Sequence, residues 1–394
     1  MASGLTGGAG EDTQLSEQQV GPLGATGDRL ERHPSWLELF FDLVFVAAIA
    51  ALARQLHDDH SVAGLAVFVG LFVPVWWAWR GFAWYATGFD TDDRTFRAAC
   101  LAGMIGVAAV SAGIDGAAHG DSETFVIAYS GLLCVLAALY LRTWWRVPAA
   151  RPLAARQAIG YSLGATVWMG SLTLDEGVRP IMWGVAMVAL IATPIAVLRQ
   201  PQRAYDAAHI AERYGLFTII VLGESVIVTV AGLDTGGNAE AAFVALLGFV
   251  IAATIWWVYF SRYRSMPGVG ASARFVWAQM HLLIFLGITA AAVGVAFAVE
   301  AVVGDDALSL ADRLPLGAGL ASYLIAMGSI RAVTRQLDWV ALMRIGLAGT
   351  MLAFALIGLG LAPLAFVAVI AALLVAEATI ELTRAAPDHL QDST

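Results

Sequence analysis

Long runs of apolar residues, separated by charges or by Pro/Gly turns, are the feature of this sequence that most restricts its fold. The first run opens at Trp36 and reaches about residue 56, which is enough to cross a bilayer core of ~30 Å as a helix. Because 59% of the 394 residues are hydrophobic and 13% are charged, the chain is far from a soluble average. The pattern predicts an all-α polytopic membrane protein with about twelve transmembrane helices, near residues 36–56, 62–86, 95–115, 123–145, 157–174, 180–198, 213–233, 240–261, 274–300, 314–334, 338–361 and 363–383.

The distribution of arginine tests this count. All 22 basic residues are arginine, and with a cytoplasmic N-terminus most of them fall in cytoplasmic segments. The loops on the other side are acidic, as at 57–60, 120–123 and 304–306. This asymmetry is the one that the positive-inside rule expects. We therefore predict twelve spans with both termini in the cytoplasm.

An internal repeat is also indicated. Clustered aromatic residues close the second and eighth predicted spans, and 180 residues separate Trp76 from Trp256 as they separate Arg94 from Arg274. Six spans per half would give parallel repeats about an axis along the membrane normal. Aromatic belts, which recur at any membrane interface, are the alternative explanation. The predicted organisation is a disordered cytoplasmic tail, two six-helix halves and a short C-terminal tail, at residues 1–34, 35–200, 201–385 and 386–394.

Composition argues against several classes of function. The net charge of −9 and the lack of a basic domain disfavour nucleic-acid binding. Cys100 and Cys134 lie in apolar runs without CxxC or Cys/His ligand spacing, so neither a disulfide framework nor a metal site is predicted. No GxSxG, HExxH or P-loop motif occurs, and no cofactor is implied. The partner that the sequence predicts is the lipid bilayer, whereas the oligomeric state stays open.

Charged residues inside the apolar runs are candidate site residues, since a charge within the bilayer must be paired or face protein or water. Glu38 and Asp42 lie four residues apart on one face of the first predicted helix. Arg80 lies at a similar depth in the second, antiparallel span, so we predict that Asp42 or Glu38 pairs with Arg80. A static pair that locks two helices is one interpretation, and a carboxylate that changes partner during transport is the other.

Glu224 is the deepest acid, about eleven residues or ~16 Å into its predicted span. No arginine of the next span lies at its depth, and Gly223 leaves space beside it. Because burial without a partner favours the neutral form, Glu224 is the residue that we first expect to exchange protons near neutral pH. A glutamic acid hydrogen-bonded into helix packing is the alternative.

Three further groups lie toward the cytoplasmic side of the later spans: His281, Arg344 and the Glu377/Glu381 pair. Arg344 and Glu377 are expected to meet between antiparallel neighbours. His281 is expected to be a hydrogen-bonded core residue rather than a titrating relay. A cavity open to the cytoplasm would explain why buried charges gather on that side.

Two cytoplasmic loop motifs complete the candidates. The first is acidic and contributes Asp90, Asp92 and Asp93. It could hold a cation but lacks the Gly and distant Glu of an EF-hand loop, and the alternative is that Asp92 or Asp93 caps the next helix. The second motif contributes three residues on roughly one side of a helix, for which we expect interfacial salt bridging: His209, Glu212 and Arg213.

Three stretches carry a family resemblance: Glu38–Val46, Phe89–Asp93 and Glu212–Ser225. They resemble the signature stretches of the bacterial low temperature requirement A family, and the resemblance runs through nearly the whole membrane region. It implies a multi-pass protein of the bacterial inner membrane, without a settled substrate or reaction.

These features favour a secondary transporter of a small solute or ion, coupled to protons through buried carboxylates, over an enzyme. The alternative is a membrane-embedded enzyme acting on a lipid or isoprenoid diphosphate, because paired acidic motifs hold magnesium diphosphate in membrane prenyltransferases. The second motif would then come from Asp206 and Glu212, whose spacing is poor. A sensor or scaffold without turnover is a third hypothesis.

Overall fold

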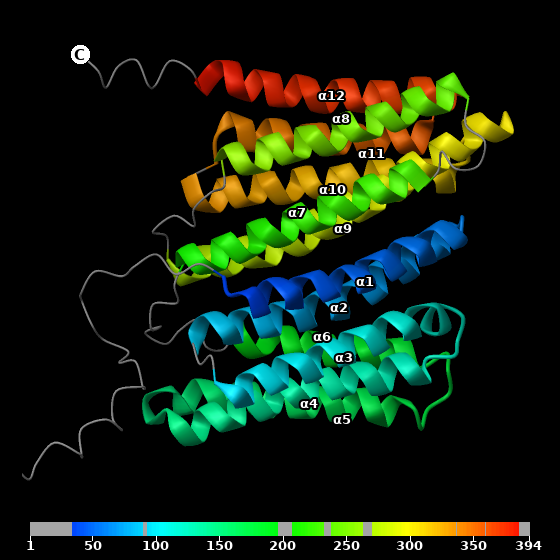
Figure 1. The fold of residues 1–394 in the computed structure, drawn as a ribbon. Helices are drawn as coiled ribbons and strands as arrows, with labels where there is room; N and C mark the ends of the chain where they lie inside the picture. The colour runs from blue at the N-terminus through cyan, green and yellow to red at the C-terminus, as the bar shows by residue number, and fades with distance from the viewer. Residues whose placement is uncertain are drawn as a thin grey trace, which may run out of the picture. The chain divides into compact units, whose positions relative to one another are not determined.

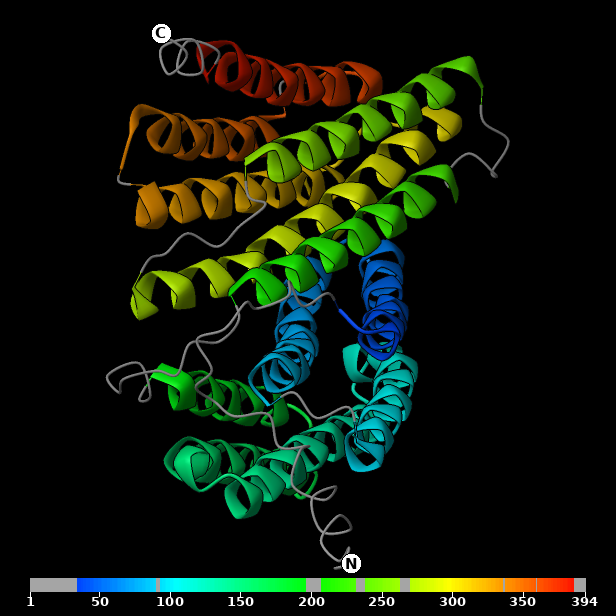
Figure 2. The ribbon, with the colours of Figure 1, turned by 60° about the vertical axis from the view of Figure 1, so that its left-hand side comes forward.

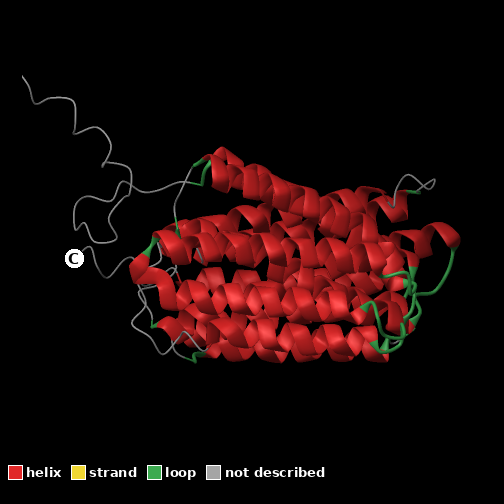
Figure 3. Cartoon of the chain, turned by 90° about the horizontal axis from the view of Figure 1, so that it is seen from below, coloured by secondary structure: helices red, strands yellow, loops and turns green. Residues whose placement is uncertain are grey.

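The computed structural model describes residues 34–89, 93–195, 207–231, 238–262, 270–335, 337–358 and 360–385. Within these ranges all regular structure is helical, and no β-strand occurs (Figure 3). The elements are α1 (Trp36–Asp58), α2 (Val62–Gly88), α3 (Arg94–Ala118), α4 (Glu123–Arg146), the 3₁₀ helix η1 (Pro148–Ala150), α5 (Arg151–Ser171), α6 (Arg179–Ile195), α7 (Ala207–Ala231), α8 (Ala239–Arg262), α9 (Ala271–Gly304), α10 (Leu310–Arg335), α11 (Trp339–Ile357) and α12 (Pro363–Ala385). Outside the described residues lie both predicted tails, apart from Pro34, and the candidates Asp90, Asp92 and Asp206.

Polar caps start several helices at the point where an apolar run begins. Ser35 and Glu38 form a capping box at α1, in which each side chain accepts a hydrogen bond from the other residue's backbone N–H. Asp93 accepts from the backbone N–H of Phe96 at 2.8 Å and caps α3, which confirms one of the two caps predicted there. Asp338 caps α11 in the same way through the N–H of Ala341.

Ten of the described helices are long and apolar enough to cross a membrane: α1 to α4 and α7 to α12. The chain is therefore a multi-pass membrane protein that would sit in a lipid bilayer. The other two helices, α5 and α6, occupy the fifth and sixth predicted runs. Helix α5 starts earlier than predicted and takes in Arg151 and Arg156, which dilute its apolar character. Helix α6 has 17 residues and so spans about 26 Å, less than a typical ~30 Å hydrocarbon core.

The helices pack in two sequential groups within residues 34–385 (Figures 1 and 2). In the first group α1 packs on α2 and α3, α4 packs between α3 and α5, and α6 packs on α5. In the second group α9 contacts α7, α8, α10 and α12, while α11 packs on α10. The groups meet where α1 and α2 contact α7 and α9. The α1–α3, α3–α4 and α4–α5 contacts of the first group have counterparts in α7–α9, α9–α10 and α10–α11.

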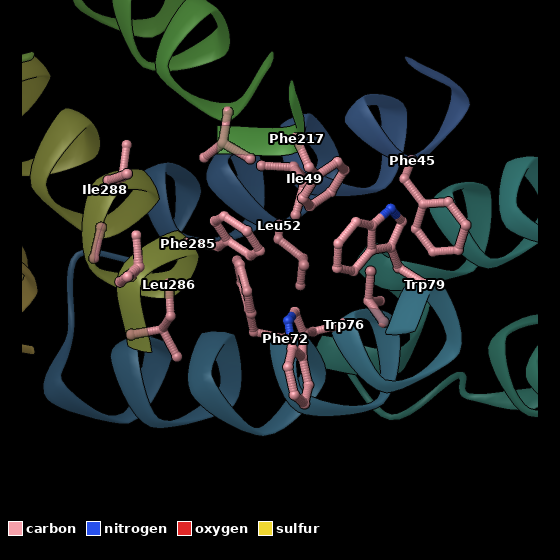
Figure 4. Close-up of a cluster of buried hydrophobic side chains, with 14 of the residues drawn as sticks. Phe45, Ile49, Leu52, Phe72, Trp76, Trp79, Phe217, Phe285, Leu286 and Ile288 are labelled. Carbon is pink, nitrogen blue, oxygen red and sulfur yellow. The ribbon is translucent and has the colours of Figure 1, made fainter. Parts of the chain in front are cut away.

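Aromatic side chains fill the junction between the two groups (Figure 4). Trp79 of α2 stacks on Phe217 of α7, with ring centroids 4.4 Å apart, and meets Phe285 of α9 edge-on. Phe45, Ile49 and Leu52 of α1 lie in the same cluster. Close van der Waals contact between such large rings is a main favourable term where helices pack within a bilayer, and it fixes α2 against helices of the second group.

Candidate functional site: a buried charge cluster between α1 and α7

Four charged or titratable side chains meet where α1 packs on α7. Helix α1 supplies Glu38 and Asp42, and α7 supplies His209 and Arg213; in each case the two residues are four apart and share a helix face. His209 Nε2 lies 3.2 Å from Glu38 Oε1. The Arg213 guanidinium donates to Asp42 through Nη2 and, at 3.4 Å, through Nε. None of the four residues is more than 4% exposed, and we call them the charge cluster.

Further polar contacts complete the charge cluster. Arg213 Nη1 lies 3.6 Å from Glu38 Oε1, so the arginine faces both acids. The indole Nε1 of Trp79 donates to Asp42 Oδ1 at 2.8 Å and brings α2 into the site. Buried indole N–H groups usually have such an acceptor, but Trp76 and Trp77 of the same helix are also buried and have none among the described residues, so the residue type alone would not have identified Trp79 from sequence.

The predicted pairing of Asp42 or Glu38 with Arg80 is wrong. Both acids instead face Arg213, which lies 171 residues further along the chain from Asp42. Consecutive residues on a helix point about 100° apart, so Trp79 faces Asp42 while Arg80 faces the rings of Trp77 and Phe275. Arg80 lies on the helix that follows α1 in the sequence, whereas the arginine that binds Asp42 comes from α7 of the second helix group.

Charge counting shows what the charge cluster can do chemically. Two carboxylates face one guanidinium, which is permanently charged, and one imidazole. Arg213 contacts both acids, and His209 contacts Glu38. In a site of low dielectric, an uncompensated charge is costly. The stability of the site therefore depends on how these four groups are paired.

The comparisons with known proteins address the same part of the chain. The family model described as Bacterial low temperature requirement A protein (LtrA) matches residues 33–379, which include the charge cluster. The chain belongs to the LtrA family. The resemblance seen in the sequence is thus confirmed, and the protein is a multi-pass membrane protein of a bacterial family.

The LtrA-family chain is similar to an uncharacterized protein of Rhizobium meliloti (strain 1021), with 28% identity over 303 residues that cover 68% of this chain and 73% of the relative. No solved structure matches the chain.

A second network of charges joins α10, α11 and α12 in the LtrA-family protein. Arg344 Nε donates to Glu377 Oε1 at 2.7 Å, which confirms the predicted meeting of these two residues. Arg344 also binds Glu381, whose other oxygen lies 3.3 Å from Arg331 Nη1. Arg331 in turn binds both oxygens of Asp338, at 2.8 and 2.9 Å, and this guanidinium lowers the pKa of the Asp338 carboxyl. Charges of opposite sign thus alternate along the network.

His281 is a hydrogen-bonded core residue, as predicted. Its Nδ1 donates to the backbone oxygen of Trp277 at 2.8 Å, so that Nε2 accepts from the hydroxyl of Tyr259 at 2.9 Å. The residue is 1% exposed. Both ring nitrogens are satisfied in the neutral tautomer, and this arrangement favours a role in packing.

Glu224 lies apart from the charge cluster, eleven residues or about 16 Å further along α7 than Arg213. Its side chain is half-buried, and it forms no hydrogen bond or ion pair with the residues that the structure describes. Gly223 is exposed, and no atom of another described element lies within 4 Å of a Cβ built on it, so the space beside it is on the outer surface of the protein.

The loop candidates are divided between structural and cluster roles. Besides capping α3, Asp93 binds Arg142 of α4. His209 and Arg213 belong to the charge cluster. Glu212, which precedes Arg213 in the sequence, is half-buried. Among the described residues, no group of three or more His, Cys, Asp or Glu side chains is placed to hold a metal ion.

Proposed function

We propose that this LtrA-family protein is a secondary transporter of the bacterial inner membrane that couples movement of a small solute to protons. The observation that carries the proposal is the charge cluster itself, buried at the junction of the two helix groups. Ionisable residues inside membrane helices are costly, and they commonly mark ion and substrate pathways. All four side chains of the charge cluster are buried, at most 4% exposed, and Trp79 of the aromatic cluster shown in Figure 4 binds Asp42.

A proton fits the charge cluster as coupling ion. The cluster brings three side chains that can take up or release a proton, Glu38, Asp42 and His209, next to one permanently charged guanidinium. A cluster that loses a proton carries one more negative charge and is driven toward a different pairing. Arg213 can satisfy either acid, since it already contacts Glu38 and Asp42.

The position of the cluster supports transport rather than catalysis. Under this proposal, α1–α6 and α7–α12 are two parallel repeats of six spans, with twelve spans and both termini in the cytoplasm. Contacts within one group have counterparts in the other, and α1 and α7 are the corresponding first helices. Secondary transporters bind solute and coupling ion at the interface between repeats, where rocking of one half exposes the site to either side.

Reconstitution of the full chain into liposomes that contain a pH-sensitive dye tests the proposal. Sugars, amino acids, monocarboxylates and inorganic ions are added in turn under an imposed proton gradient, with protein-free liposomes correcting for leakage of weak acids. At least one solute class should cause protein-dependent proton uptake. His209→Gln should abolish the coupling, while Glu123→Gln at the exposed start of α4 should leave it unchanged. Solute-independent flux throughout, or full coupling in the His209 variant, would contradict the proposal.

A further inference from the structure

Arg80 is a buried cation that the charge cluster does not use. It is 4% exposed, and its Nε atom is buried without a hydrogen-bond partner. Among the described residues, no carboxylate forms an ion pair with it, although Asp42 is bound by the preceding residue, Trp79. A guanidinium without a counter-ion is unusual inside a protein, because the loss of hydration must be offset by some partner.

Aromatic rings surround this guanidinium. The Arg80 Cζ atom lies 4.6 Å from the ring centroid of Trp77, 5.3 Å from that of Trp84 and 6.0 Å from that of Phe275 on α9. Ring faces attract the cation but offer no acceptor in the plane of its N–H groups. The fork of donors is therefore left for another group to fill.

A second hydrogen-bond donor, the hydroxyl of Tyr214, lies next to Trp84. The hydroxyl of Tyr214 accepts a hydrogen bond from Trp84 Nε1 at 3.1 Å, so its own proton remains to be donated. Tyr214 is fully buried, and the charge of Arg80 acts on its hydroxyl. We call these five residues the Arg80 box: Trp77, Arg80, Trp84, Tyr214 and Phe275.

We infer that the Arg80 box binds a small monovalent carboxylate that carries an apolar body. One uncompensated positive charge requires one negative charge, and a planar guanidinium matches a carboxylate through two parallel hydrogen bonds. The three ring faces suit an apolar or aromatic body, and Trp77 Nε1, which is buried without a hydrogen-bond partner among the described residues, is a further neutral donor. Trp84 and Phe275 are half-buried, so the box is less closed on their side.

The box adjoins the charge cluster through α2. Trp79, which holds Asp42, and Arg80 are consecutive residues, and Tyr214 follows Arg213 on α7. A bound carboxylate would neutralise Arg80 next to groups whose pairing depends on a proton. As a substrate assignment the inference rests on the proposed function, whereas binding itself can be tested without transport.

The probe is 4-fluorobenzoate, whose binding to the full chain in detergent is followed by ¹⁹F line broadening. Saturable binding is expected, together with displacement by unlabelled benzoate. The neutral isostere 4-fluorobenzamide and inorganic phosphate should not compete. Arg80→Gln should weaken binding at least tenfold, and Arg54→Gln, at an exposed arginine of α1, should leave it unchanged.

Tyr214→Phe provides a second variant that keeps the ring and removes the donor, in case Arg80→Gln does not fold. It should weaken binding severalfold. Equal binding of the amide and the acid, wild-type affinity in both box variants, or no saturable binding to the native protein would overturn the inference. If benzoate binds but no solute drives proton flux, the binding site stands and the proposed transport function is wrong. If another solute class drives proton flux but benzoate does not bind, the transport function stands and the binding site is wrong.

Discussion

At the scale of single residues, the face of the helix on which a side chain lies decides which charges meet. Trp79 and Arg80 are neighbours on α2, yet one donates to Asp42 and the other lies among aromatic rings. Asp42 is bound by both the indole and the Arg213 guanidinium. Removing one partner of such a buried pair leaves the other charge uncompensated, which is more costly than replacing both.

The coupling between Asp42 and Arg213 can be measured directly. We expect Asp42→Asn to destabilise the protein by about 3 kcal/mol and Asp42→Asn/Arg213→Gln to recover part of that loss, because the double variant removes both members of the buried pair. A double-mutant cycle on the thermal unfolding of the detergent-solubilised protein should give a coupling energy of at least ~1 kcal/mol. The cycle of Asp42 with Arg80 is the matched control and should give a smaller value; the opposite order would contradict the observed pairing.

Asp338 predicts a pH dependence outside the membrane spans. The Arg331 guanidinium lowers the pKa of Asp338, so its stabilising contribution is present above the ordinary value and is lost as pH falls below about 4. Asp338→Asn keeps a good helix cap but cannot ionise. The variant should be less stable than the wild type at neutral pH, and the difference in melting temperature should shrink in acid. A difference that is constant from pH 7 to pH 3 would exclude this ion pair as its source.

At the scale of helices, close backbone approach accounts for the tight packing of α9 on α10. Gly287 and Gly319 face each other, and a Cβ added at Gly319 would lie 2.7 Å from the Gly287 oxygen and 2.8 Å from the Ala291 nitrogen. Backbone atoms cannot move aside as a flexible side chain does. Small residues allow such approach between membrane helices, where dispersion contacts replace the hydrophobic driving force.

Gly319→Ala should therefore be destabilising, by about 1–3 kcal/mol, through overpacking. Gly346→Ala on α11 is the matched control, because nothing lies within 4 Å of its added Cβ. Alanine in that exposed helical position should be neutral or stabilising by up to ~1 kcal/mol. Thermal unfolding of the two variants under the same conditions decides the matter, and equal effects would show that the α9–α10 contact is not close-packed.

At the scale of the whole molecule, the two helix groups are joined at both ends of α1. The charge cluster lies near its start, and near its end His57 lies 2.7 Å from Glu300 of α9. His60, in the turn before α2, lies 3.0 Å from Asp312 of α10. Movement of one group past the other, which the proposed transport function would need, would have to break these contacts.

Whether the chain crosses the membrane ten or twelve times depends on α5 and α6. If both cross the membrane, reporter fusions at Gly120 and Gly177 should report outside and a fusion at Ala150 should report inside, in line with the arginine distribution. An inside result at Gly177 with the other two as expected would reduce the protein to the ten helices that length and apolarity already establish.

The sequence by itself determined the helical class and the positions of the apolar helices, because hydropathy over about twenty residues is a local property. It also predicted the Arg344–Glu377 pair, since that pair joins helices adjacent in the chain. Only the tertiary structure decided that Asp42 meets Arg213 and that Arg80 has aromatic neighbours instead. Asp42 and Arg213 are 171 residues apart, and their contact depends on how the two helix groups pack. Neither the periodicity of the sequence nor the local spacing of its residues predicts that packing.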